Sequence, residues 1–275
     1  MENSPYYDFK IDIEMRLIYL SACFALFCIA VCPAPSSASN GLAAETAETE
    51  NARPEPDIAN PLTLNVAPLT LNEERAVGQR LAYLYAQRHS LSGDVRMQER
   101  LNRIATRMCA AFEMPVPDIM IVKSSQAEAV SFPPNRIFIT STLVKLARSD
   151  DELAAVIAHE AAHVRRRHLA HLIRLSLTLT AGERAYFPTR AAIVTGQIVQ
   201  FAFPPSLDTV RLRYEMEADR QAVLWLERAG YESLALSSLL ESLATRLSPQ
   251  EFQESESLRA RIALLAPETA VVAAR

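Results

Sequence analysis

Two histidines and a glutamate near the middle of the chain have a spacing that could support metal-dependent hydrolysis. His159, Glu160 and His163 form the pattern H-E-x-x-H in a segment with helical periodicity. Residues four apart lie on one face of a helix, so both imidazoles could reach the same metal ion. Glu160 would then lie beside the metal, where its carboxylate can hold and deprotonate a water molecule. The pattern predicts a metal-dependent peptidase site with Glu160 as the general base.

A catalytic zinc site also needs a third protein ligand. Glu215 and Asp219 are four residues apart on another predicted helix, so one could bind the metal while the other orients a ligand histidine. Acidic residues on amphipathic helices are usually solvated, so spacing alone leaves this assignment open, and Glu217 is an alternative ligand. His168 and His171 follow H-E-x-x-H, but on one continuous helix they would point away from the metal-binding face. We therefore expect them to be surface residues.

The segments around these residues predict an α+β fold, mostly helical with one small mixed β-sheet. Helical spacing of apolar residues occurs at 73–88, 101–112, 142–147, 209–228, 232–247 and 257–265, and short β-type runs occupy 119–122, 127–132 and 136–140. Ser149 and Glu152 have capping-box spacing at the start of the helix that carries H-E-x-x-H. We expect that helix to continue unbroken to about residue 175.

The N-terminal region has the features of an export signal. An apolar run from Leu17 to Val31 follows Met15 and ends in small residues around Ala38, as in a secretory signal peptide. We expect a signal peptide at 1–38, with Met15 as the candidate true start, a flexible linker at 39–71, a zinc metallopeptidase domain at 72–267 and a C-terminal tail at 268–275. An uncleaved anchor is the alternative. Either interpretation places the domain in the periplasm, free or anchored to the membrane.

The composition argues against some classes of function. With 49% hydrophobic and 22% charged residues, the chain has a globular composition. Its formal net charge of −4 and its lack of a basic patch argue against nucleic-acid binding. Residues 175–205 are apolar but interrupted by charges and prolines. They predict either a cap or loop that faces a membrane or partner, with peripheral membrane association, or ordinary core packing.

These motifs resemble those of the gluzincin metallopeptidases, which include the CAAX prenyl endopeptidase, the heat-shock membrane protease and the periplasmic β-barrel assembly-enhancing protease. The resemblance covers about 73–265 and rests on H-E-x-x-H, on E-x-x-x-D at 215–219 and on Ala-Gly-Tyr at 229–231. It implies a zincin-like fold with one zinc ion (Zn²⁺) per chain. The implied metal ligands are His159, His163 and Glu215, with Asp219 as the partner of a ligand histidine.

The resemblance also implies where a substrate binds. Family members carry an edge strand before the metal-binding helix, and the matching strand here contains Ala129, Val130 and Ser131. An edge strand offers unpaired backbone groups, so these residues would bind an extended peptide as an added strand. The glycine pair that family members place in the following turn is replaced by Pro134 and Asn135.

A larger departure lies near the C-terminus. Family members place His-Pro before an Arg-Ile pair, whereas this chain has Ser255 and Glu256 before the Arg-Ile at 261–262. The family histidine is expected to stabilise the oxyanion of the tetrahedral intermediate, and losing one such donor typically costs about 2.7–4 kcal/mol of barrier. Tyr214 or Arg213 could substitute for it.

Together these features predict an exported zinc-dependent metalloendopeptidase that hydrolyses peptide bonds of unfolded or misassembled envelope proteins. By family analogy, its partners would be protein or peptide substrates and the outer-membrane protein assembly machinery. The missing histidine supports an alternative, a metal-binding periplasmic assembly factor or chaperone with weak or no peptidase activity. Glu160 argues against this alternative, because a purely structural metal site needs no general base.

Overall fold

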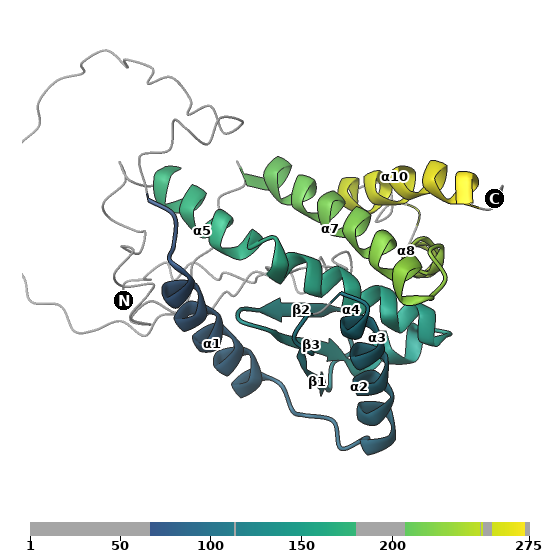
Figure 1. Cartoon of the computed structure of the whole chain (residues 1–275), viewed down its shortest axis with the longest axis horizontal. Helices are drawn as coiled ribbons and strands as arrows, with labels where there is room; N and C mark the ends of the chain where they lie inside the picture. Colours follow the sequence, from purple (N-terminus) through teal and green to yellow (C-terminus); the bar gives the residue numbers. More distant parts are fainter. Residues whose placement is uncertain (1–66, 113, 180–206, 248, 250–254, 273–275) are drawn as a thin grey trace, which may run out of the picture.

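The computed structural model describes residues 67–112, 114–179, 207–247, 249 and 255–272. This part of the chain is mostly helical and contains a three-stranded sheet, as the sequence predicted (Figure 1). The predicted signal peptide, most of the predicted linker and most of the apolar region 175–205 lie outside the described residues. None of the described helices is both long enough and apolar enough to cross a membrane.

The sheet is small and mixed. β1 (Asp118–Val122) runs parallel to β3 (Arg136–Thr140), and β2 (Ala129–Phe132) pairs antiparallel with the other side of β3. Consecutive side chains of a strand point to opposite faces, yet the middle of β3 is buried without a break from Ile137 to Ile139. Both faces of the sheet are therefore covered, and the order β1-β3-β2 places β2 at an edge.

Helix α1 (Leu71–Arg88) packs closely against the end of β2. Gly78 of α1 permits this approach, because a Cβ atom at this position would collide with the backbone carbonyl of Pro133 in the turn after β2. α2 (Val95–Ala110) contacts β1, and α3 (Ser141–Leu146) directly follows β3.

Helix α4 (Asp150–Arg165) lies between the sheet and α7 (Asp208–Ala229) (Figure 1). Its start is fixed by Ser149, whose hydroxyl accepts the backbone N–H of Glu152 at 3.1 Å. The Glu152 carboxylate accepts the backbone N–H of Arg148 instead of that of Ser149, so only half of the expected capping box forms. All residues of α4 from Glu152 to His163 are buried, since this helix packs on both layers.

Three further helices lie on the side of α4 that faces away from the sheet, the first two packed directly on α4 and the third packed on those two. They are α7 (Asp208–Ala229), α8 (Ala235–Ala244) and α10 (Glu256–Val272). α7 ends at Gly230, whose φ of 71° is a left-handed conformation that glycine adopts without strain. Arg107 of α2 donates hydrogen bonds to the carbonyls of Ala229 and Gly230 and thereby joins the end of α7 to α2.

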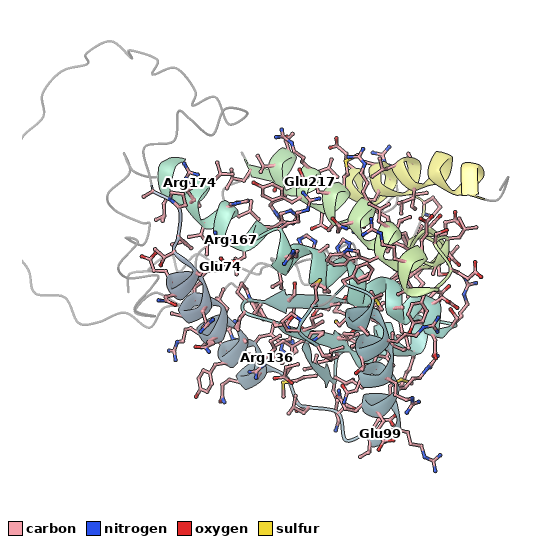
Figure 2. All side chains as sticks on the ribbon, in the orientation of Figure 1. Glu74, Glu99, Arg136, Arg167, Arg174 and Glu217 are labelled. Carbon is pink, nitrogen blue, oxygen red and sulfur yellow. The ribbon has the colours of Figure 1, made fainter. Side chains whose placement is uncertain are left out.

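The prediction of one unbroken helix through residue 175 is wrong. α4 ends at Arg165, and α5 (His168–Leu179) begins after Arg167, which has a φ of 59°. Glu74 of α1 explains the break, because its carboxylate pairs with the Arg167 guanidinium at 2.6 Å. The same guanidinium donates to the carbonyl of Leu69 at 2.8 Å. Figure 2 shows Glu74 and Arg167 side by side where α1 meets the α4–α5 junction.

Candidate metal centre

Helices α4 and α7 bring two histidines and a carboxylate together. His159 and His163 lie one turn apart on α4 and are both buried, with their Nε2 atoms 3.0 Å apart. Glu215 comes from α7, and its carboxylate oxygens lie 3.4 Å from the His159 Nε2 and 3.6 Å from the His163 Nε2. One ligand atom from each residue falls within 4.8 Å of the other two. The three side chains could therefore hold one metal ion.

The spacing of these atoms suits a small tetrahedral ion. Zinc binds imidazole nitrogen at about 2.0–2.1 Å and carboxylate oxygen at about 2.0–2.2 Å, which places neighbouring tetrahedral ligand atoms about 3.3–3.5 Å apart. The 3.0 Å between the two Nε2 atoms and the 3.4 Å from the His159 Nε2 to Glu215 Oε2 are within a few tenths of an ångström of that spacing, and the other Glu215 oxygen, Oε1, lies 3.6 Å from the His163 Nε2. Two imidazoles and one carboxylate also form the donor set of many catalytic zinc sites.

Asp219 and Arg261 support the His159 side of the cluster. His159 Nδ1 lies 2.8 Å from Asp219 Oδ1, and the Arg261 guanidinium donates to both Asp219 oxygens at 2.7 Å. Burial is the largest influence on the pKa of Asp219 and raises it, but the charge of Arg261 and the interactions with His159 together outweigh burial and lower this pKa. Although burial opposes the charge on His159, the carboxylates of Asp219 and Glu215 raise its pKa to about 9. Asp219 therefore stays ionised and can fix the orientation of the His159 ring.

The general-base candidate, Glu160, is almost fully buried next to His159 on α4. Arg261 and Tyr85 are electrostatic neighbours of its carboxylate, because its charge influences both. The Tyr85 hydroxyl donates to Glu128 at 3.2 Å. Burial first, then the negative charges of Glu128 and Glu160, raise the pKa of Tyr85 well above its usual range. Tyr85 is therefore a neutral hydrogen-bond donor near the start of β2.

His168 does not lie where the sequence predicted. It was expected on the surface, but it is buried, and its Nδ1 atom is 3.0 Å from the Nδ1 of His163. The break after α4 explains the difference, because it turns the first residue of α5 back toward the metal cluster. Burial and the neighbouring His163 lower the pKa of His168 to about 2, so this ring is neutral. His171, in contrast, has an exposed side chain, as expected.

The remaining carboxylate of the segment faces a different partner. Glu217 lies with its Oε2 atom 3.5 Å from the His168 Nε2 and does not belong to the metal-binding group. Helical geometry accounts for this separation, because residues two apart on a helix face different directions.

The predicted substrate strand lies directly beside the metal-binding helix. Ala129, Val130 and Ser131 belong to β2, which contacts α4 and pairs only with β3 within the described residues. Their side chains are all buried, so a peptide could contact this strand chiefly through backbone groups on its outer edge.

The candidates for oxyanion stabilisation are spread around the centre. Arg213 is exposed, whereas the Tyr214 ring stacks on the ring of His168 with centroids 4.4 Å apart. Ser255, at the position of the family histidine, is buried, and its hydroxyl has no hydrogen-bond partner among the described residues. Glu256 is exposed at the start of α10.

Sequence reasoning missed two residues at this centre, Arg261 and His168. A signal for Arg261 existed, because the Arg-Ile pair belongs to the pattern that aligned the C-terminal region. No local signal could place His168, since its position depends on the contact between Arg167 and Glu74, 93 residues apart.

Comparison with known proteins agrees with this geometry. Residues 96–267 match the sequence profile of peptidase family M48. The β-barrel assembly-enhancing protease of Yersinia pestis is 25% identical over 217 residues, which are 72% of this chain and 43% of that protein.

Two further relatives come from different groups of organisms. The β-barrel assembly-enhancing protease of Escherichia coli (strain K12) is 25% identical over 187 residues, 64% of this chain and 38% of that protein. The mitochondrial metalloendopeptidase OMA1 of Arabidopsis thaliana is 28% identical over 135 residues, 46% of this chain and 25% of that protein. The chain thus spans less than half the length of each of these three relatives.

Proposed function

The chain belongs to peptidase family M48, whose profile matches more than half of it, and from this premise we propose that it is a zinc-dependent metalloendopeptidase. One observation carries the proposal. His159, His163 and Glu215 place three ligand atoms within 4.8 Å of one another. The buried Glu160 lies next to them, on the turn of α4 that carries both histidines. A structural metal site would need the three ligands but not Glu160.

The residues of the centre have separable roles in this proposal. His159, His163 and Glu215 would hold the zinc ion, which when bound would polarise the scissile carbonyl and lower the pKa of a water molecule. The Glu160 carboxylate would accept a proton from that water and later return it to the leaving amine. Asp219 would hold the His159 ring through Nδ1, and Arg261 would hold Asp219 in place.

The edge position of β2 supports an extended peptide as substrate. β2 contacts α4, the helix that carries His159 and Glu160. A peptide paired with the outer edge of β2 would run alongside these residues, its register set by backbone hydrogen bonds at Ala129, Val130 and Ser131. Such binding recognises backbone groups more than side chains. It therefore favours unfolded segments, whose backbone groups are accessible, over folded proteins.

The relatives named β-barrel assembly-enhancing proteases motivate a location and a substrate class. We infer that the chain acts in the periplasm on unfolded or misassembled envelope proteins, with the outer-membrane protein assembly machinery as a partner. The predicted signal peptide at 1–38 supports the same location.

A second candidate function is a metal-binding periplasmic assembly factor or chaperone with weak or no peptidase activity. It rests on Ser255 and Glu256, which stand where family members have His-Pro. Both candidates bind the metal in the same way, so the rate of peptide cleavage distinguishes them.

The test combines metal analysis with degradation of casein and of denatured outer-membrane proteins by the full chain. We expect one zinc per chain and cleavage that is lost in Glu160→Gln, which keeps the ligands and the shape of the side chain. Glu227→Gln is the matched control, because Glu227 is exposed near the end of α7 and should leave cleavage unchanged. One zinc without cleavage by the unmodified chain would favour the assembly factor, and absence of bound metal would refute both candidates.

A further inference from the structure

The two histidines of the candidate metal centre contact different groups through their Nδ1 atoms. His159 is backed by the carboxylate of Asp219, with 2.8 Å between Nδ1 and Oδ1. His163 is backed by the imidazole of His168, with 3.0 Å between the two Nδ1 atoms. The carboxylate is the familiar arrangement behind a metal-ligating histidine, whereas the imidazole is a second histidine that the proposed chemistry does not use.

The short contact between these imidazoles requires a defined arrangement of protons. Two ring nitrogens at 3.0 Å can form a hydrogen bond only if one carries a proton and the other offers a lone pair. His163 needs a free lone pair on Nε2 to bind the metal, so its proton must be on Nδ1. The Nδ1 of His168 is then the acceptor, and the proton of the His168 ring is on Nε2.

The surroundings hold the His168 ring in the orientation that this hydrogen bond requires. Its ring lies parallel to the ring of Tyr214, with an interplanar angle of 4° and centroids 4.4 Å apart. Its Nε2 atom lies 3.5 Å from the Oε2 of Glu217 and makes no hydrogen bond within the described residues, but the carboxylate charge at this distance favours an N–H on Nε2. The His168 side chain is almost completely buried. Stacking on one face and a carboxylate at the far nitrogen together define which nitrogen meets His163.

The backbone bends at Arg167, the residue before His168. Arg167 adopts a φ of 59°, a left-handed conformation that is costly for a residue with a side chain. Such conformations persist where surrounding contacts determine them, and they concentrate at functional sites. Here the contacts are the ion pair with the buried Glu74, which lies beside Arg167 in Figure 2, and the hydrogen bond to the Leu69 carbonyl. Helix α1 therefore holds the bend that turns His168 inward.

We propose that His168 is a positioning residue for His163: its Nδ1 accepts the hydrogen bond that His163 Nδ1–H donates and so keeps His163 Nε2 directed at His159 and Glu215. The Arg167–Glu74 pair sets the bend that makes this contact. The inference rests on the proposed metal site and adds to it the residue that fixes the tautomer and orientation of the second ligand histidine.

The test compares zinc binding by two replacements of His168. His168→Phe keeps a ring that can stack on Tyr214 but removes the acceptor, and it should weaken zinc affinity about 10–100-fold, the usual effect of losing a group behind a ligand. His168→Asn places an amide oxygen near the position of Nδ1 and should restore most of the lost affinity. His171→Phe is the control, because His171 is exposed on the same helix and should bind zinc like the unmodified chain. Affinity is measured by competition with a chelator, on full chains whose folding is first checked by circular dichroism.

A second measurement needs no variant. In the zinc form of the unmodified chain, nitrogen-15 chemical shifts of the imidazoles should report His163 with its proton on Nδ1 and His168 with its proton on Nε2. Zinc binding through His163 Nδ1, or a His168 that carries its proton on Nδ1, would overturn the inference.

The possible failures are distinguishable. If the unmodified chain binds no zinc, the proposed metal site is wrong. If it binds zinc and His168→Phe binds equally well, the metal site stands and the role of His168 is refuted. If His168→Asn is as weak as His168→Phe, the hydrogen bond is not the reason for the loss, which also refutes the inference. If His168→Phe does not fold, the nitrogen-15 shifts of the unmodified chain decide.

Discussion

Replacing Arg261 should destabilise the fold strongly, even in the absence of metal. Its side chain and that of Asp219 are almost completely removed from solvent, and two hydrogen bonds of 2.7 Å join them. Arg261→Met keeps a long side chain but removes the guanidinium charge and both of its hydrogen bonds from the buried Asp219 carboxylate, which keeps only its contact with the His159 ring. Removing one partner of a buried ion pair costs about 3–5 kcal/mol of unfolding free energy. For a protein of this size, that corresponds to a fall in Tm of about 6–20 °C.

The assay is urea unfolding of the full chain in the presence of a chelator, so that metal binding does not contribute to the measured stability. Arg100→Met is the matched control. Arg100 pairs with Asp150 at 2.5 Å, but both side chains are partly exposed, with 30% and 56% of their surface accessible. Exposed pairs contribute about 0.2–1 kcal/mol, so this variant should change the unfolding free energy little.

A double variant tests the cause of the loss. Arg261→Met combined with Asp219→Leu removes both charges, and replacing a buried pair by apolar residues is often close to neutral. The double variant should therefore be more stable than Arg261→Met alone. If Arg261→Met destabilises the fold no more than Arg100→Met, or if the double variant shows no recovery, the buried ion pair is not the source of this stability.

Two other predictions concern the ligand set and the packing of α1. Glu215→Ala should lose zinc on dialysis while Glu227→Ala, at an exposed position of the same helix, retains it, as measured by elemental analysis, because Glu215 belongs to the group of three ligand atoms and Glu227 does not. Equal retention by both variants would contradict this assignment. Gly78→Ala should lower the unfolding free energy by about 1–3 kcal/mol, because the new methyl group meets the backbone carbonyl of Pro133. Gly93→Ala, where no atom of the described residues other than the chain neighbours lies within 4 Å of the added carbon, should leave the urea midpoint nearly unchanged.

The sequence predicted the parts of this structure that depend on local spacing. The pairing of His159 with His163 follows from the helical repeat, and the small mixed sheet follows from short β-type runs separated by turn residues. The sequence did not predict the end of α4, because helical periodicity continues past Arg165 and no glycine or proline marks the break. The break is fixed by Glu74 on another helix. Tertiary contacts of this kind have no pattern in a single sequence.

Helix α10 carries two features that concern different steps of the proposed function. Arg261 on this helix pairs with Asp219 and so supports the His159 side of the centre. Ser255 and Glu256, at its start, replace the residues that family members are expected to use for oxyanion stabilisation. In the proposed function, metal binding would depend on the first feature and turnover on the second, so they can change independently. Zinc binding alone would therefore not establish peptidase activity, and only the comparison of cleavage by the unmodified chain with cleavage by Glu160→Gln distinguishes an enzyme from a metal-binding assembly factor.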